Sequence, residues 1–229
     1  KTKATNTLHQ WQTDALADVA ANAAVEGADI SYGTMAPTVL ENNHTQISTK
    51  GIQVTATNEA VTSAGRNNEM AYQVAKAAKE LKRDMETALL SNVAKTAGSS
   101  SAARKLGGCP TWYETNVDAG TSGSGAGNGA IRTDGTQRAF TEDQLKGILV
   151  SCYNEGGNPN MIMVNAFNKQ KLSGFTGGST RFDAAEDRRL ITSIDVYESD
   201  FGTMQVSPNR FIRGANGTAA KIGQDAHIL

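Results

Sequence analysis

Residues 66–93 read RNNEMAYQVAKAAKELKRDMETALLSNV and carry the strongest structural signal in the chain. Apolar side chains recur in this stretch every three or four positions, the spacing that lines one face of an α-helix. They are Met70, Val74, Ala78, Leu81, Met85, Leu89 and Val93. At 1.5 Å per residue, these roughly 28 residues would make a helix about 40 Å long. A typical globular helix has only ~11–12 residues, so the pattern predicts a rigid structural spine.

The other face of the predicted helix is charged. Two of its pairs have the i,i+4 spacing that stabilises a helix by a few tenths of a kcal/mol each: Lys76–Glu80 and Lys82–Glu86. Asn67 or Asn68 can cap the start of the helix, because a side-chain oxygen there accepts from the first free backbone N–H groups. We expect Gly98 to end it.

The segment before the helix, residues 1–64, is rich in Thr, Asn, Gln and Ala and is predicted to be extended. Within it, residues 45–57 place apolar side chains among β-favouring threonines, while Gly51 interrupts the alternation. This pattern favours either a strand pair or one kinked strand. In residues 11–28, the leucine, the valines and the alanines favour a helix, whereas the flanking residues favour a strand. Both interpretations stay open there.

The stretch that follows the helix, from Gly98 to Gly129, is predicted to be rich in loops. It is densest in glycine at residues 120–129, which read GTSGSGAGNG. Such a composition is typical of flexible surface connections. No Gly-Lys-Ser/Thr and no complete GxGxxG accompanies it to bind a phosphate. We expect a domain boundary or an insertion here.

The next part of the chain is predicted to run helix, strand, helix. Thr141 can cap a helix whose first turn is acidic, as the helix dipole favours. The buried face of that helix is predicted to hold Leu145, Ile148, Leu149 and Cys152. Glycines and Pro159 break it, Met161–Val164 follows as a short buried strand, and a second helix starts from Asn165.

The last part of the chain reads as strand. Residues 190–211 alternate β-branched and aromatic side chains about a turn at residues 199–202, which predicts a hairpin. Residues 227–229 are apolar and strand-like.

Composition narrows the function classes. Hydrophobic residues make up 38% of the 229, against ~45–50% in an average domain, so part of the stability is expected to come from neighbours. The 22 basic and 23 acidic residues nearly cancel, which argues against phosphate-driven nucleic-acid binding. No apolar run approaches the ~18–20 residues of a membrane span. Cys109 and Cys152 form no CxxC pattern and are interpreted as reduced thiols, which favours a reducing cytoplasm.

No catalytic constellation emerges from the motifs. His9, His44 and His227 lack metal-ligand spacing, so no metal site and no cofactor are predicted. The nucleophile motif GxSxG is absent. Acidic pairs such as Glu80 and Asp84 could serve as general acid and base, but they alternate with Lys and Arg as an interface or a solvated face does. The chain is predicted not to be an enzyme, and a soluble enzyme that uses the acidic pairs is the alternative.

The lean core, the long helix, the extended N-terminal segment and the glycine-rich loop together suggest a lattice subunit. Extended arms project backbone hydrogen-bonding groups and side-chain anchors that an isolated chain would struggle to bury. The candidate anchors here are Trp11, Ile47 and Ile52. Another subunit could cover them.

Short stretches along nearly the whole chain carry a family resemblance. They are HQWQTDALA at 9–17, VEGAD at 25–29, NHTQI at 43–47, AGR at 64–66, Tyr72-Gln73, ELKRDME at 80–86, ARK at 103–105, Val164-Asn165, YESDFG at 197–202 and Asn209-Arg210. In this order they resemble a family of tailed-bacteriophage and prophage major capsid proteins, once filed as a domain of unknown function, whose fold is that of the phage Hong Kong 97 capsid.

The resemblance implies an α+β fold of the Hong Kong 97 type. Residues 1–64 would form an extended β-hairpin loop, of which 5–62 lie over a neighbouring subunit. Residues 65–108 would form a peripheral domain around the spine helix, 109–139 a glycine-rich insertion or linker, and 140–229 a mixed α/β axial domain. Family members generally also have an N-terminal arm and a C-terminal strand that returns to the peripheral domain, and the chain is expected to lack both.

The resemblance also implies a function, which is self-assembly into the pentamers and hexamers of an icosahedral head. The shell would enclose double-stranded DNA without sequence-specific contacts. Portal, scaffold and cement or decoration proteins would be further partners, and a membrane would not. The subunit would assemble in the cytoplasm of the bacterial host and end in the virion. An encapsulin-like nanocompartment shell, which shares this fold, is the alternative.

Contacts between subunits are predicted for residues of the extended loop and the charged helix face. They are Trp11, Asp14, Ile47, Ile52, Arg83, Asp84 and Glu86. Some relatives of this fold form lysine–asparagine crosslinks, and Lys50 lies in the extended loop. It has no supporting motif and is interpreted as a solvated lysine.

Overall fold

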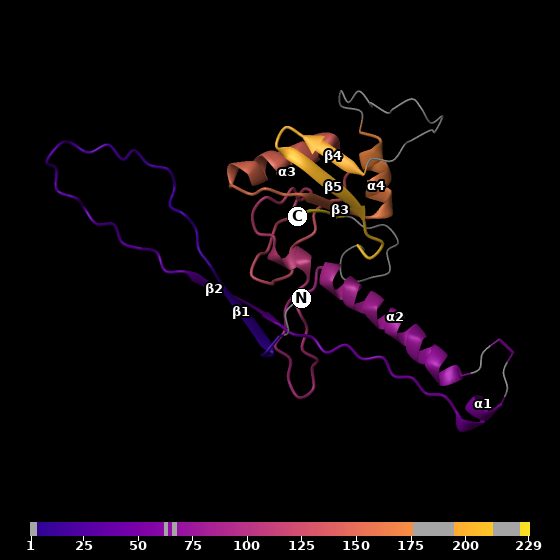
Figure 1. Cartoon of the computed structure of the whole chain (residues 1–229). Coiled ribbons are helices and arrows are strands. Elements are labelled where there is room, and N and C mark those ends of the chain that lie inside the picture. Colours follow the sequence, from indigo (N-terminus) through magenta and orange to yellow (C-terminus); the bar gives the residue numbers. More distant parts are fainter. Residues whose placement is uncertain (1–3, 62–63, 66–67, 176–194, 213–224) are drawn as a thin grey trace.

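The structure is a computed structural model, which describes residues 4–61, 64–65, 68–175, 195–212 and 225–229. A four-stranded sheet and two helices hold the core, and two long segments project from them (Figure 1). The sheet order is β4-β5-β3-β6. Its strands are β4 (Val196–Ser199), β5 (Gly202–Pro208), β3 (Met161–Val164) and β6 (Ala226–Ile228). β3 is parallel to β5, and the outer strands pair antiparallel.

The core combines side chains from α3 (Glu142–Asn154), α4 (Ala166–Ser173), β3 and β5. Its buried members are Leu145, Leu149, Ile162, Val164, Leu172, Met204 and Val206. Burying an apolar side chain of this size contributes ~1.5–3 kcal/mol, so this cluster is the main source of stability in the body. The predicted α+β class is confirmed.

Most of the local expectations for this body are confirmed. Thr141 and Gln144 form a capping box at the start of α3, in which each side chain accepts from the other residue's backbone N–H. Leu145 and Leu149 are buried as predicted, whereas Ile148 and Cys152 are only half-buried. The predicted hairpin is β4–β5, although residues 190–194 of that prediction lie outside the described residues.

The predicted spine is α2 (Glu69–Leu90), a helix of 22 residues. Asn68 caps it, because its Oδ1 accepts from Ala71 N at 2.7 Å, while Asn67 lies outside the described residues. The predicted end at Gly98 is wrong, since Ser91 already has extended backbone, with φ −92° and ψ 147°. Gly108 packs against that end so closely that a Cβ there would lie 1.9 Å from Ser91 O. Tertiary packing therefore ends the helix early.

The charged face of α2 follows the prediction in part. Lys76 and Glu80 form the predicted pair, with Nζ and Oε1 3.9 Å apart. The predicted Lys82–Glu86 pair is not formed among the described residues. Glu86 Oε1 instead accepts from Asn209 Nδ2 at 2.9 Å, which ties α2 to the segment that follows β5.

The N-terminal segment forms a hairpin whose strands are far apart in sequence. β1 (Leu8–Thr13) pairs antiparallel with β2 (Val39–His44), and Leu8 lies opposite His44. The sequence left helix and strand open for residues 11–28. The structure has a strand up to Thr13, and residues 14–28 are neither helix nor strand. Residues 14–38 form a long loop that extends far from the body (Figure 1). We call residues 14–38 the arm.

Residues 45–57 do not form the predicted strand pair. Residues 46–54 are extended, but within the described chain no backbone hydrogen bond joins them to a strand. They run beside α2 (Figure 1) and lead into α1 (Ala56–Ala60), a short helix beyond its far end. Side-chain contacts with α2 replace the expected strand ladder.

The glycine-rich stretch is packed, contrary to the flexible connection that its composition predicts. It begins with a short 3-10 helix at Cys109–Trp112. A Cβ on Gly120 would lie 2.1 Å from Thr136 O, and one on Gly125 would lie 2.6 Å from Tyr113 O. These glycines let backbone segments approach one another closely, so here the residue type serves packing.

Candidate assembly interface

The apolar stripe of α2 is present but uncovered. Met70, Val74, Met85 and Leu89 are all at least 40% exposed. The hydrophobic residues of α2 that are buried are Ala77 and Leu90. An amphipathic helix normally turns its apolar stripe toward a core, and here the described part of the chain does not supply one. The stripe is therefore a candidate contact surface.

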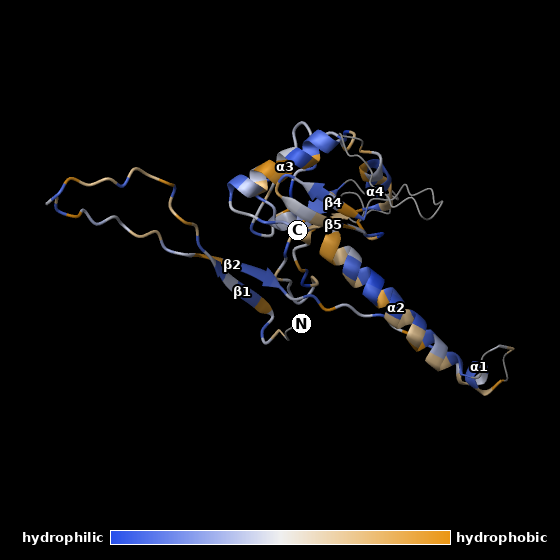
Figure 2. Ribbon diagram, turned by 45° about the horizontal axis from the view of Figure 1, so that its top comes forward, coloured by the Kyte–Doolittle hydropathy of each residue, from blue (hydrophilic) through white to orange (hydrophobic). Residues whose placement is uncertain are grey.

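The arm exposes even more apolar area. Its large apolar side chains are each at least 79% exposed: Leu16, Val19, Val25, Ile30, Tyr32 and Met35. Figure 2 shows hydrophobic residues along the arm, interspersed with hydrophilic ones. Apart from one turn bond, from Ala28 N to Val25 O at 3.0 Å, its backbone groups have no backbone partner within the described chain. The arm is a second candidate contact surface.

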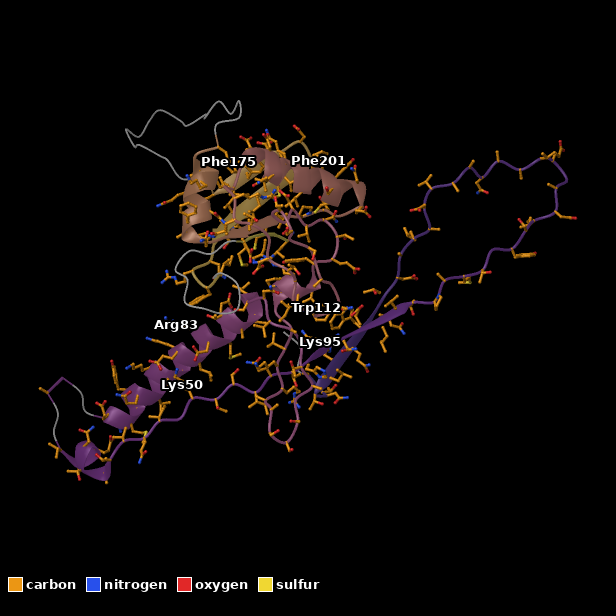
Figure 3. The ribbon with its side chains drawn as sticks, turned by 180° about the vertical axis from the view of Figure 1, so that it is seen from behind. Lys50, Arg83, Lys95, Trp112, Phe175 and Phe201 are labelled. Atoms are coloured by element: carbon orange, nitrogen blue, oxygen red, sulfur yellow. The ribbon has the colours of Figure 1, made fainter. Side chains whose placement is uncertain are left out.

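An aromatic and cationic cluster fixes the base of the arm. The Trp11 ring, on β1, lies 5.1 Å from the Trp112 ring, measured between centroids. The Lys95 ammonium lies 5.4 Å from the centre of the Trp112 ring and donates to Asn42 O, on β2, at 2.9 Å. Figure 3 shows Lys95 and Trp112 beside the hairpin. Both strands are thus held against the loops that follow α2.

Backbone-directed hydrogen bonds complete this attachment. Asn43 and Gly107 bond twice, because Asn43 Nδ2 donates to Gly107 O at 3.2 Å and Gly107 N donates to Asn43 Oδ1 at 2.9 Å. Arg104 Nε donates to Thr45 O at 2.6 Å. These contacts fasten the base of the hairpin to the loops that follow α2.

A second attachment holds the extended segment against α2. Lys50 Nζ lies 3.3 Å from Asp84 Oδ2 and 3.5 Å from Glu80 Oε2. The hydrogen bond with Asp84 raises the pKa of Lys50 above its usual value. Lys50 is thus solvent-exposed, as the sequence predicts, and it also forms ion pairs that the sequence does not predict. Figure 3 labels Lys50 on this segment and Arg83 on α2.

The predicted contact residues of the N-terminal segment fall into two groups. Trp11 is half-buried in the cluster at the base of the arm. Asp14 begins the arm and is exposed, with its Oδ1 accepting from the backbone N–H of Ala15 at 2.9 Å. Ile47 is 77% exposed and Ile52 36% exposed on the extended segment. Their contacts with another subunit stay predictions.

The predicted contact residues of α2 differ in how they are engaged. Asp84 and Glu86 have partners in the chain itself, Lys50 and Asn209. The exposed Arg83 guanidinium has no ion-pair partner among the described residues. Sequence reasoning missed Lys95 and Trp112, whose roles depend on the packing of loops that no periodic pattern signals.

Within the described residues, the acidic pairs are engaged by lysines. Glu80 and Asp84 are both engaged by Lys50. Glu142 lies 2.9 Å from Lys146 as an i,i+4 pair on α3. Within the described residues, no group of three His, Cys, Asp or Glu side chains could hold a metal ion. In the same residues no helix combines the length and the apolar character needed to cross a bilayer.

One cavity of about 530 Å³ lies between the glycine-rich loops and the sheet body. Arg132 occupies its wall and pairs with Asp225 at 2.5 Å and with Asp134 at 3.2 Å. His227, on β6, is 2% exposed, and among the described residues its Nε2 has no hydrogen-bond partner. Burial lowers the pKa of His227, while Asp225 opposes the shift and Arg132 adds to it. Arg132 thus has two carboxylate partners in the wall, and the His227 ring packs on Tyr113. These contacts link β6 to the glycine-rich loops on the other side of the cavity.

The small mixed core and the long exposed apolar segments leave two apolar surfaces, the arm and the stripe of α2, uncovered within the described chain. Comparisons with known proteins identify the family. The family model described as SU10 major capsid protein matches residues 1–225, and the chain belongs to this family. It is 47% identical over 91 residues to the major capsid protein of Escherichia phage Phieco32. That match covers 39% of the chain and 26% of the relative, so the matched part spans about a quarter of the curated relative's length.

Family membership confirms the resemblance to phage major capsid proteins. These are structural proteins, so the comparisons favour neither the enzyme alternative nor the encapsulin-like one.

Proposed function

We propose that the chain is a self-assembling shell subunit of a bacteriophage head and has the Hong Kong 97 type of fold. The observation that carries this proposal is the uncovered apolar surface on two projecting elements, the arm and the stripe of α2. Family membership supports it independently. In this assignment residues 1–64 are the extended loop, 65–108 the peripheral domain, 109–139 a packed insertion and 140–229 the axial domain.

The mechanism is geometric. The arm of one subunit lies over its neighbour, and the rigid hairpin base sets the angle at which it leaves. Each large apolar side chain of the arm gains ~1.5–3 kcal/mol when fully buried, and much of the sum is offset by the freedom lost on docking. Because each subunit both gives an arm and receives one, closed rings form and the contacts reinforce one another.

The partners of the subunit follow from this role. Copies of the chain would form rings of five and six around packaged double-stranded DNA, which the nearly neutral chain tolerates without reading its sequence. Portal, scaffold and cement or decoration proteins would contact the finished shell. The subunit would assemble in the host cytoplasm and become part of the virion.

The contact residues have separate roles in this proposal. Trp11 acts indirectly, because it orients the arm that begins at Asp14. Ile47 and Ile52 offer apolar contacts beside α2. Asp84 and Glu86 form part of the surface on α2 that receives the neighbour's arm, and they also bond Lys50 and Asn209. Arg83, which has no ion-pair partner among the described residues, adds a cation to that surface.

An arm-less variant tests the role of the arm. Joining Thr13 to Val39, which face each other in the hairpin, through Asn-Gly replaces the arm with a two-residue turn. The protein, with whatever sequence naturally flanks it, would be compared with this variant by negative-stain electron microscopy and light scattering. We expect rings or shells from the unaltered protein and folded, unassembled subunits from the variant.

Two results would contradict the proposal. One is an unaltered protein that stays monomeric at every concentration with a native circular dichroism spectrum. The other is an arm-less variant that closes shells as readily as the unaltered protein. Circular dichroism of the variant is the control that its body still folds.

A further inference from the structure

We propose that the free edge of β6 is a strand-acceptor site, where an extended, basic segment of a different protein adds a fifth strand to the sheet. Because the site lies within one subunit, it goes beyond the proposed function and does not depend on shell formation. Three features of the molecule carry the proposal: the unpaired backbone of β6, the size of the adjoining cavity and the charges of its wall.

The backbone of β6 has one paired side and one free side. Leu229 and Met161 exchange two hydrogen bonds, from Leu229 N to Met161 O and from Met161 N to Leu229 O, both at 2.8 Å. In an antiparallel ladder, such hydrogen-bonded pairs alternate with pairs whose backbone groups point away from each other. His227 is therefore the next residue of β6 that bonds to β3. Ala226 and Ile228 turn their N–H and C=O groups to the free side.

These outward backbone groups have no hydrogen-bond partner within the described chain. β6 is an edge strand of the sheet, and Ala226 and Ile228 are half-buried against the core. A buried N–H or C=O group that lacks a partner costs free energy, and a free strand edge is a template for another strand. The edge of β6 can therefore bind an extended chain.

The cavity of about 530 Å³ borders this edge, and its wall includes all of β6. On the face of the sheet where Ala226 and Ile228 pack on the core, the wall includes Ile148 of α3 and Phe167 of α4. On the other face it includes Tyr113, which packs on His227. The glycine-rich loops line the rest, and Figure 1 shows the C-terminus, next to β6, beside these loops. A cavity bordered by both faces of an edge strand lies along the free side of that strand.

The size of the cavity suits a short strand. A strand rises ~3.3 Å per residue, lies ~4.8 Å from its neighbour and belongs to a layer ~10 Å thick, so each residue fills about 160 Å³. The cavity of about 530 Å³ therefore has room for about three residues of added strand. β6 itself has 3 residues, so one short segment would cover its whole free edge.

The charges of the cavity wall favour a basic segment. Four acidic and two basic residues line the cavity, which gives a formal charge of −2 with histidine counted as neutral. They are Glu114, Asp118, Asp134, Asp225, Arg132 and Arg138. Arg132 is shared by Asp134 and Asp225, at 3.2 Å and 2.5 Å, and these three side chains are at most 28% exposed. One carboxylate charge of this group is therefore left for a cation from outside.

The two faces of the sheet specify the segment further. An added strand places alternate side chains on opposite faces. One set then faces Ile148 and Phe167, and the other faces Tyr113 and the neighbouring carboxylate of Asp225. A segment that alternates apolar residues with Lys or Arg fits both. Its main-chain hydrogen bonds to β6 supply affinity, and its side chains supply specificity.

The exposed extended segments of a second copy do not fit this description. Residues 14–38 contain no Lys or Arg. Lys50 is the one basic residue of segment 46–54, and it is ion-paired within its own chain. The segment that adds to β6 is therefore assigned to a different protein.

Hydrogen exchange at the two outward amides tests the site. The probe is the peptide acetyl-TVKVKVT-amide, added to the unassembled protein with whatever sequence naturally flanks it. Nuclear magnetic resonance of protein labelled with nitrogen-15 in alanine, histidine and isoleucine follows each amide. Without peptide, we expect the amides of Ala226 and Ile228 to exchange about tenfold faster than that of His227, or more, because only His227 bonds to β3. Saturating peptide should slow both to the rate of His227.

Matched controls separate backbone pairing from charge. The acidic peptide acetyl-TVEVEVT-amide should bind about tenfold more weakly or less, because it brings like charges to the wall. The basic peptide N-methylated throughout should give no protection, because it has no N–H groups to donate. In the protein, Asp134→Asn should weaken the basic peptide about threefold. Glu198→Gln makes the same change in charge at an exposed residue of β4, the other edge strand, and should leave the affinity unchanged.

Three outcomes overturn the inference. The first is a basic peptide that leaves the amides of Ala226 and Ile228 unprotected in a protein with a native circular dichroism spectrum. The second is an acidic peptide that protects them equally well, which would refute the basic partner. The third is slow exchange of both amides without peptide, which would show that the protein itself or a second copy covers the edge. Each of these leaves the proposed function intact, because the arm-less variant tests that separately.

Discussion

The attachment between Trp11 and Trp112 gives the sharpest test of how the arm is held. Trp112→Ala removes a ring whose centre lies 5.1 Å from the centre of the Trp11 ring and 5.4 Å from the Lys95 ammonium. It also removes the hydrogen bond that Trp112 Nε1 donates to Gly107 O at 3.3 Å. An aromatic pair contributes ~0.5–1.5 kcal/mol, an exposed cation–π contact ~0.5–1 kcal/mol and a hydrogen bond ~0.5–1.5 kcal/mol. Together they predict a loss of about 3 kcal/mol in the free energy of unfolding.

A double-mutant cycle isolates the contact between the two rings. Trp11→Ala alone should cost about 1 kcal/mol, because this ring is only half-buried. The double variant should lose about 1 kcal/mol less than the sum of the two single variants, since the shared contact can be lost only once. Urea unfolding of the unassembled chain, followed by far-ultraviolet circular dichroism, measures all four free energies without relying on tryptophan fluorescence.

The control for this cycle is His9→Ala. The His9 ring packs on Trp11 at 5.7 Å from the same strand, so its removal leaves the contact with Trp112 in place. Its coupling to Trp112→Ala should therefore be small. A coupling energy below ~0.3 kcal/mol between Trp11 and Trp112, within the range of independent sites, would refute the idea that these rings fasten the hairpin to the body.

Further predictions concern the body of the protein. Gly108→Ala should lower Tm sharply, because its Cβ would lie 1.9 Å from Ser91 O, whereas Gly147→Ala, in α3 with nothing within 4 Å, should raise the stability by ~0.5–1 kcal/mol; equal effects would contradict this packing. Leu145→Ala should cost ~2–5 kcal/mol in urea unfolding, since Leu145 is 1% exposed, and a loss under ~1 kcal/mol would count against the assigned core. Burial lowers the pKa of His227 below 6.5, so the unfolded chain takes up a proton more readily and stability should fall as the pH drops below 6.5. His227→Gln should weaken that dependence in unfolding measured across pH, and an unchanged dependence would exclude His227 as its source.

Local patterns in the sequence predict the local structure well. The three-to-four spacing identified α2, the acidic first turn after Thr141 identified α3, and alternation identified the β4–β5 hairpin. In each case the information lies within a few residues, where backbone propensity, capping and one buried face act together.

Features that depend on distant segments could not be predicted. β1 and β2 are separated by 25 residues without a turn motif, so nothing local signals their pairing. The end of α2 depends on Gly108, and the packing of the glycine-rich loops depends on close backbone approach, as at Gly120 and Thr136. Composition alone cannot distinguish glycines that permit close packing from glycines that give flexibility.

The sequence predicted exposed apolar side chains in the N-terminal segment, and their contacts with another subunit stay predictions. Exposed anchors on an extended segment were expected, and Ile47 is one of them. The arm itself, residues 14–38, was not singled out, because its alanines and valines also fit a buried helix. The ion pair between Asp84 and Lys50 depends on the position of the extended segment beside α2, which no local pattern in the sequence encodes.

In the proposed assembly, other copies of the chain bury the arm and the surface that the stripe of α2 forms with the extended segment, residues 46–54, beside it. Hydrogen–deuterium exchange of assembled particles against unassembled subunits tests it most directly. The claim predicts that amides of residues 14–38 and 46–54, which lack backbone partners within the described chain apart from the single turn bond of the arm, gain strong protection on assembly while β5 in the core stays unchanged. Particles in which residues 14–38 exchange as fast as in the free subunit would contradict it.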